Sequence, residues 1–180
     1  MEDNWRLIKS EEKFKDPVLR VEHREFYYKR NDSHGTFTVI SMKDWGVVVP
    51  VTIEGKMVLV KQYRVGSCDA AYEFPGGALE VGEDPTSGSA RELSEETGYE
   101  GELTFLSKMR PNPAFMDNFC YLYLAEKCEK TSELLLDPFE DLEPVEFDVS
   151  EVEQMILDGR IVHSISIAAY GAYRAFLTQK

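Results

Sequence analysis

A chain of 180 residues with 43% hydrophobic and 12% aromatic residues can bury a proper core, which excludes intrinsic disorder and suits a single domain over residues 1–180. The formal net charge of −13 repels the phosphate backbone of nucleic acids, so we expect no nucleic-acid partner. No run approaches the ~20 apolar residues that span a bilayer, and the acidic, polar N-terminus is unlike a signal peptide. We therefore expect no membrane partner and a cytoplasmic location. The cysteines fit no zinc-binding spacing and predict reduced thiols at Cys68, Cys120 and Cys128.

The N-terminal part of the chain predicts antiparallel β-structure. Segments rich in β-branched and aromatic residues flank the polar stretch Asn31–Gly35, which indicates a first hairpin. Glu54-Gly55 connects two further apolar segments and indicates a second hairpin, in which Pro50 favours an edge strand or a β-bulge. The four predicted strands cover residues 18–28, 36–42, 46–53 and 56–63.

The second half mixes strands with helices. One helix is predicted to begin with Asp84 as its N-cap and Pro85 as its first residue, and to end at Gly98. Ser150 and Glu153 have the spacing of a capping box for a short helix that ends near residue 159. Further strands are predicted near residues 103–109, 119–125 and 144–147, and a last helix over 164–178 with an apolar stripe at Ile165, Ala168, Ala169, Ala172 and Phe176. This order of elements predicts an α+β fold, arranged as an α/β/α sandwich with a mixed central sheet.

Three glutamates share one face of the first predicted helix. Glu92, Glu95 and Glu96 are spaced i, i+3 and i+4, so their carboxylates lie close together and repel one another. Arg91 offsets part of this repulsion, and a bound cation would offset more. Glu83, in the loop before the helix, can fold back towards the cluster. Several hard oxygen ligands at a loop and a helix suit Mg²⁺ or Mn²⁺, with a metal-bridged diphosphate as the natural partner. The face predicted to be buried consists of Thr86, Ala90 and Leu93.

Residues 77–99 carry the spacing of the Nudix box. Gly77 is followed after five residues by Glu83, and after seven more by the run Arg91-Glu92-Leu93-Ser94-Glu95-Glu96-Thr97-Gly98-Tyr99. The chain thus resembles the Nudix hydrolase family, with Tyr99 where an aliphatic residue is commoner. The resemblance implies the Nudix fold and an enzyme that cleaves a diphosphate bond with the help of a divalent metal.

The same resemblance implies roles for individual residues. The expected metal ligands are the carbonyl of Gly76 and the carboxylates of Glu92, Glu95 and Glu96, with Glu95 binding directly or through water. Glu83 and Arg91 would form an ion pair that orients the ligating carboxylates. Water would attack a phosphorus of a nucleoside diphosphate linked to another group, releasing a nucleoside monophosphate and the other group as its phosphate.

The residues before the box narrow the resemblance. The runs Lys61-Gln62-Tyr63-Arg64 and Tyr72-Glu73-Phe74-Pro75-Gly76-Gly77 look like those of the ADP-ribose and nucleoside-diphosphate-sugar pyrophosphatase branch. By this resemblance Arg64 contacts the diphosphate or the sugar, and Glu73 helps to hold the same region. The alternative is an arginine at the surface that merely pairs with an acid. Pro113 belongs to a proline-bearing loop typical of this branch, and we count it among the substrate-binding residues.

The general base is not fixed by these motifs. The ADP-ribose pattern usually ends the proline-bearing loop with a catalytic Glu, but this chain has Asn118 there, and an amide nitrogen cannot accept a proton near neutrality. The candidates are Glu95 on the helix, and Glu140 or Asp141 in the acidic segment 137–143. We favour Glu140, with a solvated acidic loop as the alternative interpretation.

In the resembled branch, two subunits exchange their N-terminal strands, and aromatic rings sandwich the nucleobase. We therefore predict a homodimer that uses residues 1–43 as an antiparallel strand extension, with Tyr28 among the substrate-binding residues. Phe26, Tyr27 and Trp45 are the other aromatic candidates, although strands enrich aromatic residues for the core as well.

The favoured function is Mg²⁺-dependent hydrolysis of a nucleoside diphosphate sugar similar to ADP-ribose. Two alternatives are another Nudix hydrolase, acting on dinucleoside polyphosphates or cleaning the nucleotide pool, and a non-catalytic module that senses a nucleotide. The motif ending in Arg64 favours the first function, whereas the intact glutamates of the box argue against the sensor.

Overall fold

The computed structural model describes residues 2–179, which form two compact units. Of the described residues, the first unit contains 2–43 and 110–119, and the second contains 44–109 and 120–179. The predicted N-terminal extension thus forms a unit with a loop, residues 110–119, that the sequence pattern did not connect to it.

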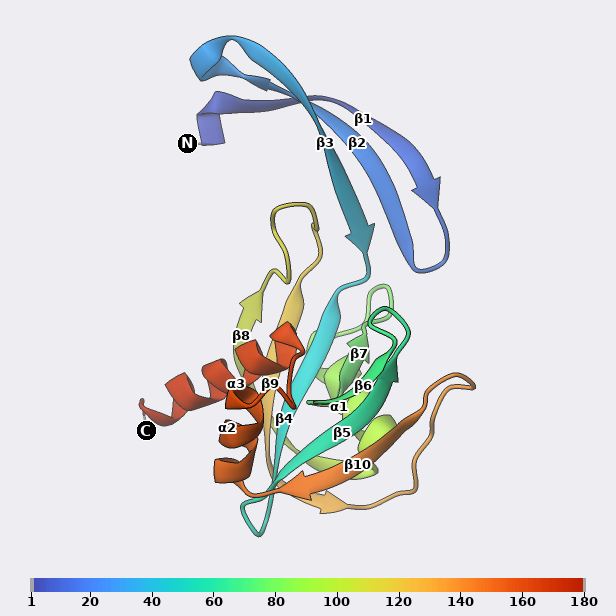
Figure 1. Ribbon diagram of the computed structural model, residues 1–180, viewed down its shortest axis with the longest axis vertical. Coiled ribbons are helices and arrows are strands. Elements are labelled where there is room, and N and C mark those ends of the chain that lie inside the picture. Colours follow the sequence, from blue (N-terminus) through green and yellow to red (C-terminus); the bar gives the residue numbers. More distant parts are fainter. Residues whose placement is uncertain (1, 180) are drawn as a thin grey trace. The chain divides into compact units, whose positions relative to one another are not determined.

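The first unit is built on an antiparallel sheet with the order β1-β2-β3 (Figure 1). The predicted hairpin is confirmed as β2 and β3, but the extension has a third strand that was not predicted. The sequence did not predict β1. Every one of its residues is exposed, so it lacks the alternation of buried and exposed positions that indicates a strand. The elements are η1 (Glu2–Asn4), β1 (Trp5–Lys15), β2 (Leu19–Tyr28), η2 (Lys29–Asn31) and β3 (Ser33–Met42).

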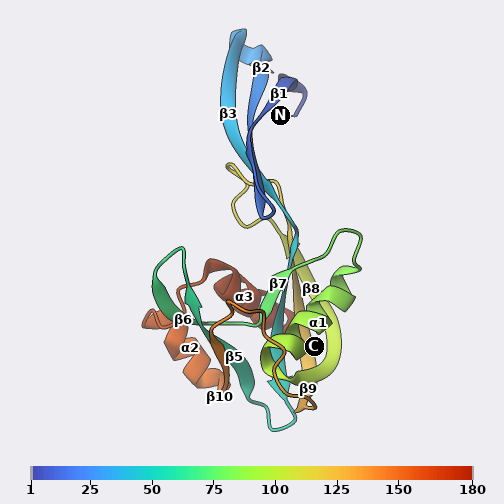
Figure 2. The same cartoon turned by 90° about the vertical axis from the view of Figure 1, so that its right-hand side faces the viewer.

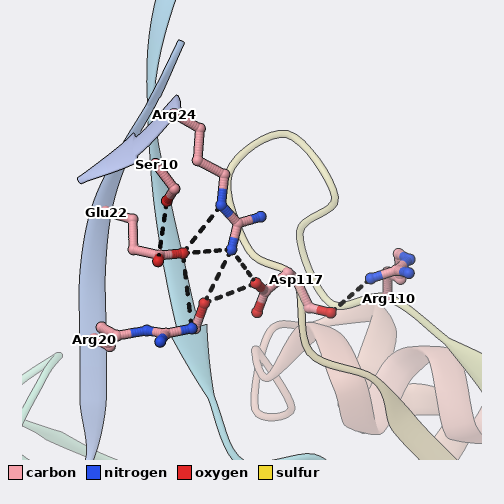
Figure 3. Close-up of polar contacts among 7 residues, drawn as sticks. Ser10, Arg20, Glu22, Arg24, Arg110 and Asp117 are labelled. Atoms are coloured by element: carbon pink, nitrogen blue, oxygen red, sulfur yellow. Dashed lines mark hydrogen bonds and ion pairs between the residues drawn. The ribbon is translucent and has the colours of Figure 1, made fainter. Parts of the chain in front are cut away.

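The loop of residues 110–119 is attached to β2 and β3 by backbone and side-chain bonds. The backbone N–H of Ile40 donates to the carbonyl of Phe115 at 2.7 Å, and that of Asp117 donates back to the carbonyl of Ile40 at 3.2 Å. One carboxylate oxygen of Asp117 accepts from Arg24 and from Ser41, both at 2.7 Å (Figure 3). Arg24 is shared with the buried carboxylate of Glu22, at 2.6 Å.

Replacing Asp117 with Ala is expected to loosen this loop. The change removes the common acceptor of Arg24 and Ser41, so we expect a loss of about 1–2 kcal/mol of unfolding free energy, discounted for partial exposure. Urea unfolding and hydrogen exchange of residues 110–119 would measure it. The matched control is Glu25→Ala, which removes an exposed contact to His34 in the same sheet and should change both readouts much less. Equal effects of the two variants would contradict the role of Asp117.

The second unit contains a mixed seven-stranded sheet, as predicted. Its main path runs β10-β5-β4-β9-β8, with β6 paired to β5 and β7 to β4. Among the described strands of this sheet, β4 and β9 pair in parallel and the other pairs are antiparallel. The elements are β4 (Trp45–Thr52), β5 (Met57–Arg64), β6 (Asp69–Glu73), β7 (Gly76–Ala78), α1 (Pro85–Thr97), β8 (Tyr99–Met109), β9 (Cys120–Lys130), β10 (Leu142–Phe147), α2 (Val149–Leu157) and α3 (Ser164–Leu177).

Successive residues of the central strand β4 point into two different cores. Val47 and Val49 belong to a large cluster that contains buried residues of α2 and α3, whereas Val48 belongs to a smaller cluster with Leu93 of α1. Helices therefore cover both faces of the sheet, α1 on one side and α2 with α3 on the other (Figure 2). This arrangement confirms the predicted sandwich. Pro50 lies in this central strand, so the edge position is wrong, but the register with β9 shifts after Pro50, as a bulge requires.

The ends of α1 follow the prediction, but its buried face and the start of α2 do not. The side chain of Asp84 accepts from the N–H of Ser87, and Gly98 takes a left-handed φ of 73°. Thr86 is exposed and Ala90 half-buried, because α1 instead turns Gly88, Ser89, Leu93, Glu96 and Thr97 inwards. The capping box is wrong because α2 begins at Val149, one residue before Ser150, with Asp148 as its N-cap. In α3, the stripe is confirmed at Ile165 and Ala169, which are buried.

The three cysteines are free thiols, with Cys120 and Cys128 buried and Cys68 exposed. Within residues 2–179, no helix combines the length and the apolar character that crossing a membrane requires.

Candidate active site

Glycines bring the loop before α1 against the central strand. Gly76 has a φ of 155°, and a Cβ there would collide with the carbonyl of Gly46 and lie 2.8 Å from the Cα of Val47. A Cβ on Gly77 would lie 2.5 Å from a carboxylate oxygen of Glu92. Because both positions lack a side chain, the loop can approach β4 on one side and the glutamates of α1 on the other.

Glu96 is a buried carboxylate with few positive partners. Only 3% of the residue is exposed, and one of its oxygens accepts the backbone N–H of Gly76 at 2.8 Å. Burial, aided by the negative charges of Glu92 and Glu140, raises the pKa of Glu96 to about 8, although the Gly76 N–H and Arg64 act in the opposite direction. A bound cation would stabilise the charged form of this carboxylate, which burial and the neighbouring negative charges disfavour.

Arg91 holds the other carboxylates around α1. Its Nη1 lies 2.8 Å from Glu92 and 2.7 Å from Glu95, and its Nε donates to Glu83 at 3.1 Å. The hydrogen bond to Glu83 contributes most to raising the pKa of Arg91. The pKa of Glu92 is raised, chiefly by burial, even though Arg91 opposes the shift. One guanidinium thus serves three acidic side chains, which leaves an excess of negative charge on this face.

The glutamates of the box are close together, but they do not converge on one point. Among residues 2–179, no three His, Cys, Asp or Glu side chains form a ready metal site. Glu92 and Glu95 turn to Arg91, whereas Glu96 turns to Gly76. The donor set still fits a hard divalent cation, because Glu96 is buried and Glu92 is half-buried, and burial raises the pKa values of both carboxylates. Mg²⁺ commonly takes only one or two protein carboxylates and completes its shell with water and substrate phosphates.

Arg64, at the end of β5, is paired with Glu73, at the end of β6. The Nε of Arg64 donates to Glu73 at 3.1 Å and its Nη2 donates at 2.8 Å, a bidentate contact. Glu73 is 2% exposed, and its second neighbour is Nδ1 of His163, at 3.0 Å from Oε2. Nδ1 of His163 is also 3.1 Å from Oγ of Ser166, which accepts the backbone N–H of Phe74 at 3.0 Å.

Burial on its own would raise the pKa of Glu73, but the hydrogen bonds from His163 and Arg64 together lower it to about 2. The stabilisation from this carboxylate is therefore complete above its usual value of 4.5 and is lost as the pH falls from 4.5 to about 2.

The Glu73→Gln variant is thus expected to lose about 3 kcal/mol of unfolding free energy at pH 6, and the gap to the wild type should narrow towards pH 3. Urea unfolding at pH 6, 5, 4 and 3 would measure it. The other carboxylates are present in both proteins, so their contributions to the pH dependence cancel in the difference of unfolding free energy. Glu151→Gln, which removes an exposed partner of Arg160, should show a small gap without this narrowing. A Glu73→Gln gap that is independent of pH would contradict the assignment.

The acidic loop before β10 brings Glu140 towards the glutamates of α1. Its charge contributes to the raised pKa values of Glu92 and Glu96, and it also acts on Arg64. Oε2 of Glu140 accepts the backbone N–H of Asp137 at 2.9 Å, and its own N–H donates to the carbonyl of Asp137 at 3.0 Å, so the turn is internally bonded. Asp141 is exposed, and its carbonyl accepts the N–H of Tyr63 at 3.1 Å.

Two residues expected to bind substrate, and the Asn that replaces the expected base, belong to the first unit. Tyr28 stacks on Trp5 with ring centroids 4.3 Å apart, and Pro113 is exposed. Asn118 is buried and donates to the carbonyl of Lys43 at 3.2 Å. The roles of Tyr28 and Pro113 stay predictions. The residues that the sequence reasoning missed are His163 and Ser166, which no motif marks; their only signal is their i, i+3 spacing at the start of a helix.

The loop, the glutamate-bearing helix and the sandwich define the class of protein. Residues 42–169, more than half of the chain, match the NUDIX domain, so the chain belongs to the Nudix family. The prediction of a Nudix hydrolase is confirmed. A solved structure described as "Crystal structure of ADP compounds hydrolase" matches with a TM-score of 0.86, covering 98% of this chain and 95% of that one, at 20% identity; this likeness shows the fold.

Sequence relatives confirm the predicted branch of the family. The ADP-ribose pyrophosphatase of Bacillus subtilis (strain 168) is 35% identical over 133 residues, 73% of this chain and 68% of that protein. The ADP-ribose pyrophosphatase of Mycobacterium tuberculosis is 31% identical over 149 residues, 80% of this chain and 72% of that protein. The methanol dehydrogenase activator of Bacillus methanolicus is 40% identical over 126 residues, 68% of this chain and 67% of that protein.

Proposed function

We propose that this Nudix hydrolase cleaves the diphosphate bond of a nucleoside diphosphate sugar similar to ADP-ribose, giving a nucleoside monophosphate and a sugar phosphate. The observation that carries the proposal is the buried carboxylate of Glu96: burial and the negative charges of Glu92 and Glu140 raise its pKa, while the Gly76 N–H and Arg64 act in the opposite direction. These carboxylates suit a divalent metal ion, and the arginine suits phosphate groups. A substrate that binds as a metal–diphosphate complex would use both. The ADP-ribose pyrophosphatases among the relatives support this substrate class.

Mg²⁺, or Mn²⁺ in its place, is the proposed cofactor. Glu92, Glu96 and the carbonyl of Gly76 would hold it, with Glu95 binding directly or through water. When bound, such a metal neutralises charge on the diphosphate and lowers the pKa of an attacking water. Glu83 acts indirectly: with Arg91 it keeps the carboxylates of α1 in place.

The chain's own residues account for the remaining steps. Arg64, held by Glu73, binds phosphate or sugar oxygens of the substrate. Glu140 accepts a proton from the attacking water, with Glu95 and Asp141 as the alternatives. The new P–O bond forms from this water, and the bond between phosphorus and the bridging oxygen breaks. Tyr28 is the proposed base contact, and Pro113 shapes the substrate-binding loop.

A substrate panel with added Mg²⁺ tests the proposal. ADP-ribose, GDP-mannose, UDP-sugars, a dinucleoside polyphosphate and a nucleoside triphosphate would be incubated with the enzyme and a coupled phosphatase that releases phosphate only from the monoester products. We expect hydrolysis of the diphosphate sugars, with the monophosphate and the sugar phosphate identified by chromatography of parallel reactions that contain no phosphatase. Preference for the polyphosphates would favour a different Nudix hydrolase, and no turnover of any compound would favour a nucleotide sensor.

We also propose that the protein acts in the cytoplasm as a homodimer that uses its N-terminal strands. Several large apolar residues of the three-stranded sheet are exposed, which supports a covered surface: Trp5, Leu7, Ile8, Phe14 and Phe37. Light scattering coupled to size-exclusion chromatography should give twice the chain mass of 20.6 kDa. A monomeric mass at micromolar concentration would contradict the dimer.

A further inference from the structure

The carboxylate of Glu73 is approached from two directions by parts of the chain that are far apart in sequence. Arg64 contacts it from the end of β5, and His163 contacts the same Oε2 from the start of α3. A carboxylate oxygen can only accept, so Nδ1 of His163 carries the hydrogen in this contact. The contact therefore links the helix to the arginine through one buried acid.

The side chain of His163 contacts Glu73 and does not cap the helix that His163 begins. His163 is the N-cap residue of α3, and its carbonyl accepts the backbone N–H of Ile167 at 3.1 Å, but its side chain makes no capping hydrogen bond. Residues at this position usually turn a short polar side chain back onto the helix, which stabilises it by about 1 kcal/mol. Here the ring turns instead towards Glu73, and helix stability alone does not explain the choice of residue.

The neighbouring bonds fix the position of the ring. Ser166, which is fully buried one turn into α3, lies 3.1 Å from Nδ1 of His163 and accepts the N–H of Phe74. Since Phe74 follows Glu73 directly, the four residues close a ring of contacts between the end of β6 and the start of α3. The orientation of the Glu73 carboxylate is thereby tied to a helix that packs on the core.

Arg64 needs such an anchor. It is the last residue of β5, and the following residues 65–70 are all exposed. A long side chain beside an exposed loop has many rotamers, and ordering it opposes ligand binding entropically. Its contacts with Glu73 use Nε and Nη2, so the N–H groups of Nη1 take no part in this ion pair.

We propose that His163 is a positioning residue: it orients Glu73, which in turn holds Arg64 ready for the phosphate or sugar oxygens of the substrate. The substrate contact of Arg64 rests on the proposed function. The link between His163, Glu73 and Arg64 does not. His163 touches no reacting atom, so its loss should weaken substrate binding more than the chemical step.

The test compares two polar replacements of similar size. In His163→Asn the side-chain amide nitrogen falls near the place of Nδ1 and can donate to Glu73, whereas in His163→Gln it falls nearer the place of Nε2. We expect KM for the best substrate of the panel to rise about tenfold in His163→Gln and in His163→Ala, with kcat within about threefold of the wild type. His163→Asn should restore KM to within about threefold. Equal KM values for the Gln and Asn variants would overturn the proposal.

A second readout needs no substrate. The Nε–H signal of Arg64 in a ¹⁵N spectrum of arginine side chains, assigned by its absence in Arg64→Lys, reports whether the guanidinium is held. It should be sharp in the wild type and in His163→Asn, and broadened or lost in His163→Gln and His163→Ala. A sharp signal in all four proteins would overturn the link. If no compound of the panel is cleaved by the wild type, the proposed function fails while this readout still decides the link.

A control separates positioning from general attachment of α3. Arg174→Gln breaks the contact between Arg174 of α3 and Glu153 of α2, at the other end of the helix. It should lower thermal stability modestly and leave KM and the Arg64 signal unchanged. If Arg174→Gln raises KM as much as His163→Gln, then His163 serves only to attach the helix, and the proposal is wrong.

Discussion

The Glu96→Gln variant is expected to lose at least about a thousandfold in kcat, which corresponds to about 4 kcal/mol of transition-state stabilisation, and yet to fold as well as the wild type. The amide is neutral, so its oxygen is a much weaker ligand of Mg²⁺ than the carboxylate that it replaces. Its oxygen can still accept the N–H of Gly76, so the loop before α1 keeps its anchor. Because the variant removes a buried charge with few positive neighbours, the metal-free protein should be at least as stable as the wild type.

Thermal unfolding with and without Mg²⁺ supplies the second measurement. A ligand that binds only the folded state raises its stability, so Mg²⁺ should raise the melting temperature of the wild type and raise that of Glu96→Gln much less. Glu102→Gln makes the same change of charge at an exposed position of β8 and should leave both the kinetics and the Mg²⁺ response intact. Activity within tenfold of the wild type in Glu96→Gln would contradict a principal role for this carboxylate.

Local signals in the sequence were sufficient for the helix that carries the glutamates. Asp84-Pro85 and Gly98 set its two ends, since each acts on the backbone within a few residues. The spacing of the acids then placed them on one side of that helix. The spacing did not predict the burial of Glu96, which lies at the border of the buried face and is covered by the loop at Gly76. The cover comes from another element, so helical periodicity cannot reveal it.

Contacts between distant segments account for the other misses. β1 has no buried residue, so its sequence shows no alternation. The turn at Glu54-Gly55 predicts the pairing of β4 with the next strand along the chain. It does not predict the parallel pairing of β4 with β9, which is far away in sequence. The link from Arg64 through Glu73 to His163 depends on β6 and α3 meeting in space, and a lone histidine in the sequence does not indicate its partner. Such features follow from the packing of the whole unit rather than from any local pattern.

The second large effect is expected for the acidic loop. Glu140→Gln should lower kcat by about 10²–10⁴-fold, the usual contribution of a general base, with KM changed by less than about threefold. The amide cannot accept a proton from water, but its oxygen can still accept the N–H of Asp137, so the turn that presents this side chain should survive. Loss of activity without loss of fold would therefore report on proton transfer.

Three further variants distinguish Glu140 from its competitors and from a change of charge alone. Glu143→Gln alters an exposed acid of β10, just after the loop, and should leave kcat within about twofold. Asp141→Asn and Glu95→Gln test the two alternative bases. The carboxylate of Glu95 already accepts a hydrogen bond from Arg91 at 2.7 Å and is less available to the attacking water, so we expect a smaller fall in kcat than for Glu140→Gln. Near-normal turnover in Glu140→Gln, with a large fall in either alternative, would move the base to that residue and leave Glu140 as one more negative charge acting on Glu92 and Glu96.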